Sequence, residues 1–94
     1  MKQSSREDLV ELLKALSDQT RMKIIEQLLE CGHMMCVNAL VAHLDVTQSA
    51  VSQHLRVLRQ AGLVDSYRKG YYIHYSVNCD RLRMIKDMVE NLLE

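Results

Sequence analysis

The side chains between residues 47 and 64 combine amides, hydroxyls and guanidinium groups that can hydrogen-bond to nucleic acids. Amides donate and accept at adenine, hydroxyls contact bases or phosphates, a methyl group packs on thymine, and guanidinium groups hold phosphate oxygens. The residues of one predicted helix that can make such contacts are Thr47, Gln48, Ser49, Ala50, Ser52, Gln53, His54 and Arg56. Arg68 and Lys69, in the predicted turn of a following hairpin, could reach phosphates or the minor groove. This pattern predicts a surface that binds double-stranded DNA.

A second group of reactive side chains lies in the segment Cys31-Gly-His-Met-Met-Cys36. Thiolates and thioethers favour thiophilic ions such as Cu(I), As(III), Cd(II), Hg(II) or Zn(II). Cys31 and Cys36, with His33 as a further candidate, are therefore predicted ligands of a thiophilic metal or metalloid ion. The spacing is not that of a standard zinc site, and two other interpretations stay open. The cysteines could form a redox-active thiol pair, or they could be small apolar residues of the core.

Length and composition indicate one small domain that is not an enzyme. The chain has 94 residues, no proline and an ordinary apolar fraction of 48%. No apolar run could span a bilayer, and the first residues lack the apolar core of a signal peptide, so we expect a cytoplasmic protein. Three cysteines, an odd number, argue against a disulfide framework. No spacing suggests a catalytic triad, a phosphate-binding loop or paired acids.

Charge is distributed unevenly along the chain although the formal net charge is zero. Residues 47–77 carry a net charge of +3, whereas residues 1–46 carry −2 and residues 78–94 carry −1. A local positive face is what contacts to DNA phosphates require. The basic segment coincides with the predicted base-reading helix and the hairpin after it.

Periodicity and capping residues predict the elements that position these side chains. Apolar residues at helical spacing predict helices over about 5–16, 18–31, 39–44, 47–61 and 80–93. Residues 63–67 and 71–77, rich in Val, Ile and Tyr, predict a β-hairpin with its turn at 68–70, and residues 34–37 predict a short extended segment. The chain is thus mainly α with a β-hairpin wing, in the order α-α-α-α-β-β-α. This order predicts a winged helix-turn-helix with an extra helix at each end, comprising residues 1–94.

Particular residues are expected to begin and orient these helices. The predicted N-caps are Ser5, Ser17 or Asp18, Asn38, Thr47 and Asp80, and Gly32 and Gly62 are predicted helix stops. The predicted apolar face of the second helix consists of Met22, Ile25, Leu28 and Leu29. Val51, Leu55 and Leu58 are expected to face the core from the fourth helix.

Three motifs, in the same order, resemble those of the ArsR/SmtB repressors. They are Ala15-Leu-Ser-Asp-Gln-Thr-Arg-Met-Lys-Ile-Ile25, Gln48-Ser-Ala-Val-Ser-Gln-His-Leu-Arg-Val-Leu-Arg-Gln-Ala-Gly-Leu-Val64 and Arg68-Lys-Gly-Tyr-Tyr-Ile-His-Tyr-Ser76. The resemblance extends over nearly the whole chain. It implies a homodimeric repressor that binds an inverted repeat in an operator, with the helix at 47–61 in the major groove, and that an inducer releases.

The resemblance also implies that the first and last helices join the dimer. Both helices have apolar stripes that so small a domain would cover poorly by itself. The predicted interface residues are Leu9, Leu12, Leu13, Leu82, Ile85, Val89 and Leu92.

The nature of the inducer is less well defined by the resemblance. Arsenic sensors of the family carry Cys-Val-Cys where this chain reads Cys36-Val37-Asn38, and zinc sensors use histidines in a last helix that has none here. A thiol-redox-responsive or effector-independent repressor of the same fold stays an alternative. A metal-binding or protein-interaction module without DNA binding is the alternative from another class.

Overall fold

The computed structural model describes residues 1–31 and 35–94. In chain order the elements are α1 (Gln3–Leu16), α2 (Gln19–Cys31), β1 (Met35–Cys36), α3 (Val37–His43), α4 (Gln48–Gln60), β2 (Val64–Lys69), β3 (Tyr72–Val77) and α5 (Cys79–Asn91). The predictions for Gly32 as a helix stop, for His33 as a ligand and for Met34 as extended chain lie outside the described residues. No helix in the described parts of the chain is long and apolar enough to cross a membrane.

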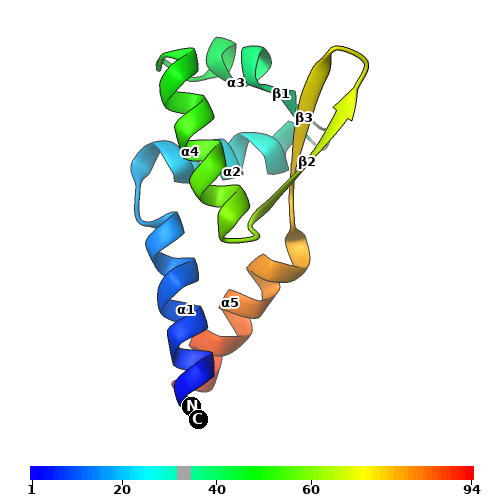
Figure 1. Cartoon of the computed structure of the whole chain (residues 1–94). Helices are drawn as coiled ribbons and strands as arrows, with labels where there is room; N and C mark the ends of the chain where they lie inside the picture. The colour runs from blue at the N-terminus through cyan, green and yellow to red at the C-terminus, as the bar shows by residue number, and fades with distance from the viewer. Residues whose placement is uncertain (32–34) are drawn as a thin grey trace.

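The elements form an elongated molecule with principal extents of 45 × 23 × 21 Å. Helices α1 and α5 pack together at one end, where both chain termini lie (Figure 1). Helices α2, α3 and α4 gather at the other end, and the β2–β3 hairpin projects beside them (Figure 1). The predicted winged helix-turn-helix with a helix added at each end is therefore confirmed.

The sheet has three antiparallel strands in the order β1-β3-β2. The two-residue strand β1 confirms the predicted extended segment at residues 35 and 36, because Met35 pairs with Tyr75 and Cys36 with His74. The strands of the hairpin pair continuously from Val64 opposite Val77 to Lys69 opposite Tyr72. The sheet thus ties the start of α3 to the base of the wing.

One apolar core joins all of the helices to the sheet. Helix α4 supplies its centre through Val51, Leu55 and Leu58, each at most 1% exposed. The other buried core residues are Leu9, Leu12, Ala15, Ile24, Ile25, Leu28, Met35, Leu40, Leu63, Val64 and Ile85. Since this core contains residues from both ends of the chain, α1 and α5 are part of the same packing unit as α4.

Two of the predicted N-caps are confirmed. The Asp18 carboxylate accepts a hydrogen bond from the backbone N–H of Arg21 at 3.0 Å. The Thr47 hydroxyl accepts one from the backbone N–H of Ala50 at 3.1 Å. Both side chains satisfy donors that the first turn of a helix leaves without an intrahelical partner.

Three other predicted N-caps are wrong, because each helix begins before the predicted residue. Helix α1 begins after Lys2, so Ser5 lies inside it. Helix α3 begins after Cys36, since β1 runs directly into it, and Asn38 lies in its first turn. Helix α5 is capped by Asn78, whose side chain accepts from the backbone N–H of Arg81 at 3.1 Å, and Asp80 lies in its first turn.

The predicted apolar face of α2 is partly wrong. Ile25 and Leu28 are buried as expected, but Met22 is 41% and Leu29 is 47% exposed, whereas Ile24 is fully buried. Helix α2 contacts α1, α3, α4 and β3. Contacts with these neighbours determine which side of α2 faces the core. Helical spacing alone did not distinguish the observed side from the predicted one.

Adjacent leucines on α2 give a direct test of this orientation. We expect Leu28→Ala to lower the free energy of unfolding by about 2–5 kcal/mol, since it removes a buried side chain and leaves a cavity. Leu29→Ala should change it by less than about 0.5 kcal/mol, because the side chain is already half exposed. Urea unfolding followed by circular dichroism measures both values. Equal losses for the two variants would contradict the observed orientation of α2.

Candidate nucleic-acid interface

Helix α4 begins and ends at residues whose chemistry defines its limits. Thr47 caps the first turn through its hydroxyl, and Gly62 follows the last turn with φ +77°. A positive φ is readily adopted by glycine and lets the chain turn from the helix into β2. The predicted helix of about 47–61 is therefore confirmed to within one residue at each end.

The two faces of α4 have opposite environments. Val51, Leu55 and Leu58, at spacings of four and three residues, lie in the core. The exposed polar side chains of the helix are Gln48, Ser49, Ser52, Gln53, Arg56, Arg59 and Gln60, and the cap Thr47 is exposed as well. Ala50 is half-buried. The amides, hydroxyls and guanidinium groups that the sequence singled out thus share one open face, with the exception of His54.

The hairpin beside α4 ends in a two-residue loop, Gly70-Tyr71. Gly70 has φ +65° at the first loop position, as a type II′ turn requires. The predicted turn at 68–70 is therefore wrong by about two residues. Arg68 pairs with Ile73 and Lys69 with Tyr72, so both basic residues belong to β2.

Their place in a strand directs the two cations to opposite faces of the hairpin. Successive side chains of a strand alternate between faces, so Arg68 shares a face with Ser66 and with Tyr75, the cross-strand partner of Ser66. Tyr75 lines a hollow against α4, and Lys69 lies on the other face. Both cations are exposed, and Arg68 lies on the face of the hairpin that looks toward α4.

Two hollows separate α4 from the hairpin. The larger, of about 580 Å³, is lined by Ser52, Leu55, Arg56, Arg59, Gln60 and Tyr75. The smaller, of about 310 Å³, is lined by Cys36, Val37, Asn38, Gln48, Ser52, Tyr71, Tyr72, Ile73 and Tyr75. Ser52 and Tyr75 line both. The surface between α4 and the hairpin is thus concave and carries hydrogen-bonding groups on both sides.

The sequence did not single out the aromatic side chains of the wing. Tyr71 at the tip is 99% exposed and Tyr72 is 57% exposed. Tyrosines so exposed combine a hydroxyl donor with an apolar ring that can lie against sugars or bases. The signal available in the sequence was the Gly-Tyr pair after two basic residues, which identifies a hairpin tip once the turn type is recognised.

His54 does not lie on the open face of α4. Its side chain is 23% exposed, and its Nδ1 lies 3.2 Å from Nη1 of Arg21 and 3.8 Å from Oδ2 of Asp18. Because a guanidinium group only donates, Nδ1 accepts from Arg21 when it carries no proton and pairs with the Asp18 carboxylate when it carries one. In the structure His54 thus joins α4 to the start of α2, and its predicted contact with DNA stays a prediction.

Arg21 connects three helices through one guanidinium group. Its Nε donates to the backbone carbonyl of Ala15 at 2.6 Å and its Nη2 to that of Lys14 at 3.4 Å, both at the end of α1. Its Nη1 reaches His54 on α4. The planar guanidinium presents several donors in a rigid geometry, so it fixes the angle between these helices in a way that a lysine could not.

The Asp18 carboxylate completes this cluster. The backbone N–H of Arg21 lowers the pKa of Asp18 from its ordinary value of 3.8, and the charges of His54 and Arg21 and the N–H of Thr20 act in the same direction. Desolvation opposes them by raising the pKa. The start of α2 therefore favours an ionised carboxylate.

The three cysteines are free and lie on three different elements. Cys31 ends α2, Cys36 belongs to β1, and both are half-buried, whereas Cys79 is exposed at the start of α5. Across residues 1–31 and 35–94, no group of three or more Cys, His, Asp or Glu side chains is arranged to hold a metal ion. The predicted thiophilic site at Cys31 and Cys36 stays a prediction.

The comparison with protein families now identifies this arrangement. Residues 18–66, which include α2, α3, α4 and the start of β2, match the model described as bacterial regulatory protein, arsR family. The chain belongs to this family. It is a DNA-binding transcriptional regulator, not an enzyme, and the predicted family is confirmed.

Individual relatives agree with this assignment. The chain is 37% identical to the transcriptional repressor SdpR of Bacillus subtilis (strain 168), over 71% of this chain and 72% of that protein. It is 38% identical to the arsenical resistance operon repressor of Escherichia coli (strain K12), over 73% of this chain and 58% of that one. An ArsR-like transcriptional regulator from Rhodococcus sp. RHA1 superimposes with a TM-score of 0.85 at 28% identity, over 95% of this chain and 82% of that one.

The lowered pKa of Asp18 predicts a defined pH dependence of stability. A carboxyl group whose pKa is lower in the folded state stabilises that state above its unfolded pKa, and the contribution is lost as the pH falls through the folded pKa. Asparagine caps a helix about as well as aspartate but cannot ionise. We therefore expect wild type to melt at a higher temperature than Asp18→Asn at neutral pH, with the difference shrinking below about pH 3.8.

Asp80→Asn is the matched control, because Asp80 lies in the first turn of α5 with a side chain that is 96% exposed. Thermal melts of the three proteins across this pH range provide the measurement. A difference between wild type and Asp18→Asn that stays constant from neutral pH to about pH 3 would rule out ionisation as its origin.

Proposed function

We propose that this regulator is a homodimeric repressor whose α4 helices read an inverted-repeat operator in the major groove. The observation that carries the proposal is the open polar face of α4, which lies opposite its buried edge and beside the concave surface of the wing. A helix of this kind fits the major groove with its first turns against the base edges.

The side chains of the first turns of α4 are suited to reading bases. Gln48 and Gln53 are exposed amides that can form paired hydrogen bonds with adenine, and Ser49 and Ser52 can contact bases or phosphates. The half-buried Ala50 can approach a thymine methyl group. The expected contacts therefore favour A·T base pairs in each half-site.

Other groups of the same surface are suited to the DNA backbone. Thr47 accepts its capping bond through the hydroxyl oxygen, so the hydroxyl hydrogen can still be donated to a phosphate. Arg56 and Arg68 line or face the larger hollow between α4 and the wing, and Lys69 lies on the outer face of the hairpin. These cations supply affinity that is independent of sequence and sensitive to salt.

Exposed apolar residues on α1 and α5 support the dimer. Of the predicted interface residues, Leu9, Leu12 and Ile85 are buried within the protomer and Leu82 is half-buried. The exposed apolar residues of the two helices are Val10, Leu13, Met84 and Val89, together with Leu92 and Leu93 just after α5. In a twofold dimer joined here, two α4 helices would lie about one DNA turn apart, roughly 34 Å.

Removing three side chains from the face of α4 tests the DNA-binding surface. We expect Ser52→Ala, Gln53→Ala and Arg56→Ala together to weaken operator binding by about 100-fold or more, since each contact contributes about 1–3 kcal/mol. The fold should be retained, because all three side chains are exposed. Fluorescence anisotropy on a duplex from the chain's own promoter measures the affinity.

The matched control changes three exposed side chains of α2, with Lys23→Ala, Glu26→Ala and Glu30→Ala. It should bind the duplex about as well as wild type does. If the α4 variant also binds like wild type, the open face does not read DNA. The alternative of a protein-interaction module without DNA binding would then fit this surface better.

Charges placed on the exposed face of α5 test the dimer. We expect wild type to sediment as a dimer at micromolar concentration and Val89→Asp with Leu92→Asp to sediment as a monomer, because a charge buried in an apolar interface is costly. Leu29→Asp, on the equally exposed side of α2, should stay dimeric. A wild-type protein that sediments as a monomer would refute the proposed assembly.

A further inference from the structure

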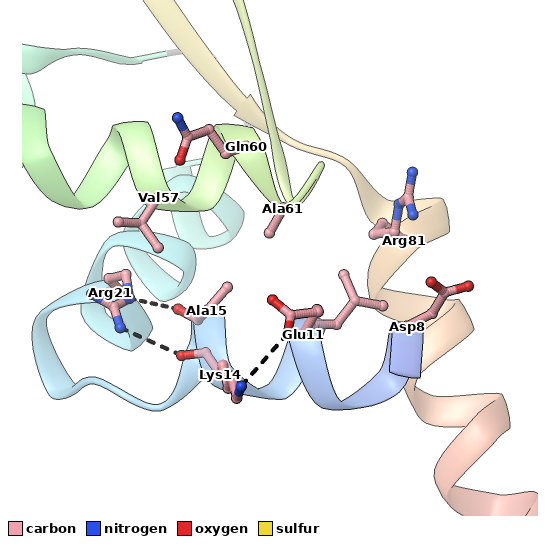
Figure 2. A pocket seen from close by; sticks show the side chains of 10 residues that line it. Asp8, Glu11, Lys14, Ala15, Arg21, Val57, Gln60, Ala61 and Arg81 are labelled. Atoms are coloured by element: carbon pink, nitrogen blue, oxygen red, sulfur yellow. Dashed lines mark hydrogen bonds and ion pairs between the residues drawn. The ribbon is translucent and has the colours of Figure 1, made fainter. Parts of the chain in front are cut away.

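A hollow of about 550 Å³ lies between α1, α4 and α5, on the side of α4 away from the wing (Figure 2). Its lining residues are Asp8, Glu11, Leu12, Lys14, Ala15, Arg21, Val57, Gln60, Ala61 and Arg81. Sites for small molecules have volumes of roughly 300–1,000 Å³ and combine an apolar surface with a few polar groups that converge on it. This hollow has both properties.

Most of its charged side chains already have partners. Lys14 pairs with Glu11 at 3.6 Å, and the guanidinium of Arg21 is occupied by two carbonyls of α1 and by His54. Asp8 and Arg81 remain, and neither forms an ion pair within 4.0 Å with any residue of the parts 1–31 and 35–94. In Figure 2 both lie toward the α5 end of the hollow. This end therefore offers one carboxylate and one guanidinium that do not neutralise each other.

Gly62 makes room for the guanidinium of Arg81. A Cβ atom at Gly62 would lie 3.2 Å from both Nε and Nη2 of Arg81, closer than ordinary van der Waals contact. Gly62 directly follows the cap of α4, so the guanidinium lies against the end of that helix. The half-buried Arg81 side chain is thus held by the backbone beside it.

Apart from Gln60, the uncharged residues that line the hollow are apolar. Leu12 and Ala15 are buried at 3% and 4% exposure, and Ala61 is half-buried. Val57, on α4 and away from the core edge of that helix, is 37% exposed. It gives the hollow an apolar wall that is open to solvent.

We propose that this hollow binds a small zwitterion with an apolar body, such as an amino acid or a short peptide. The carboxylate of the ligand pairs with Arg81, its ammonium group pairs with Asp8, and its body lies on Leu12, Ala15 and Val57. A ligand with only one charge would pair with Asp8 or with Arg81 but not with both, and would therefore forgo one charge-assisted contact. The hollow thereby selects for molecules that carry both charges.

Two of the lining residues, Val57 and Gln60, belong to α4, and Ala61 is its C-cap. The ligand would therefore contact the C-terminal end of the helix proposed to read DNA, whereas the proposed base-reading residues lie in its first turns. It changes operator affinity to the extent that it binds the free and the DNA-bound conformations unequally. This regulatory consequence rests on the proposed function, whereas binding of the zwitterion does not.

Isothermal titration calorimetry on the full chain without DNA tests the site. The probes are L-leucine, ε-aminocaproate and the dipeptide leucyl-leucine, which differ in the separation of their charges. Leucinamide and isocaproate are the matched ligands without the carboxylate and without the amine. We expect at least one zwitterion to bind and both singly charged ligands to bind at least about ten-fold more weakly.

The variants Asp8→Asn and Arg81→Gln should each weaken the zwitterion about ten-fold or more. The control Arg83→Gln, on the same helix and paired with Asp80, should not. Asp8 is exposed on α1, so the Asp8→Asn variant should fold even if changing Arg81 disturbs α5. Anisotropy on promoter DNA, measured separately, distinguishes failure of the site from failure of DNA binding.

Three outcomes would overturn the proposal. The first is that none of the three zwitterions binds. The second is that isocaproate and leucinamide bind as tightly as the zwitterions do. The third is that Asp8→Asn and Arg81→Gln leave ligand binding unchanged and instead shift the monomer–dimer equilibrium in sedimentation, which would make the hollow a contact between protomers.

Discussion

The structure depends on one helix that must be buried along one edge and open along the other. Val51, Leu55 and Leu58 of α4 are at most 1% exposed, and α4 contacts α1, α2, α3 and β2. Every other element therefore packs directly or indirectly against the helix that we propose reads the bases. Because this buried edge determines which side of α4 faces outward, core packing and the proposed DNA recognition both depend on the same orientation. The wing adds a concave surface with exposed cations and tyrosines beside that open side.

Hydrophobic packing is not directional, and polar contacts supply the directional part of this arrangement. Arg21 joins two carbonyls at the end of α1 to His54 on α4, while Asp18 caps α2 beside it. This cluster lies at one end of the α1–α4–α5 hollow, and Arg81 lies toward the other (Figure 2). A ligand in the hollow would therefore contact the same helices that the cluster connects. A site shared by these helices offers one physical route from ligand binding to a change in DNA affinity.

Features determined by nearby residues could be predicted from the sequence. The order of the elements follows from apolar periodicity, the start of α4 from Thr47, and the open face of α4 from the spacing of its core residues. Features determined by distant residues could not. The partner of His54 is Arg21, thirty-three positions earlier, and no local pattern identifies that contact. Leu29 is apolar yet exposed, because the packing of four other elements orients α2. The hollow combines residues 8–15, 57–61 and Arg81, which no local pattern connects.

We propose that the open face of α4 and the wing form the DNA-binding surface. Backbone amide signals of the isotope-labelled chain, followed by nuclear magnetic resonance during titration with its own promoter fragment, test this proposal residue by residue. We expect the largest changes in chemical shift in the first two turns of α4 and in β2, β3 and the loop between them. Smaller changes are expected on the outer sides of α1 and α5. Changes confined to α1 and α5, with α4 and the wing unaffected, would contradict a DNA-binding surface on α4 and the wing.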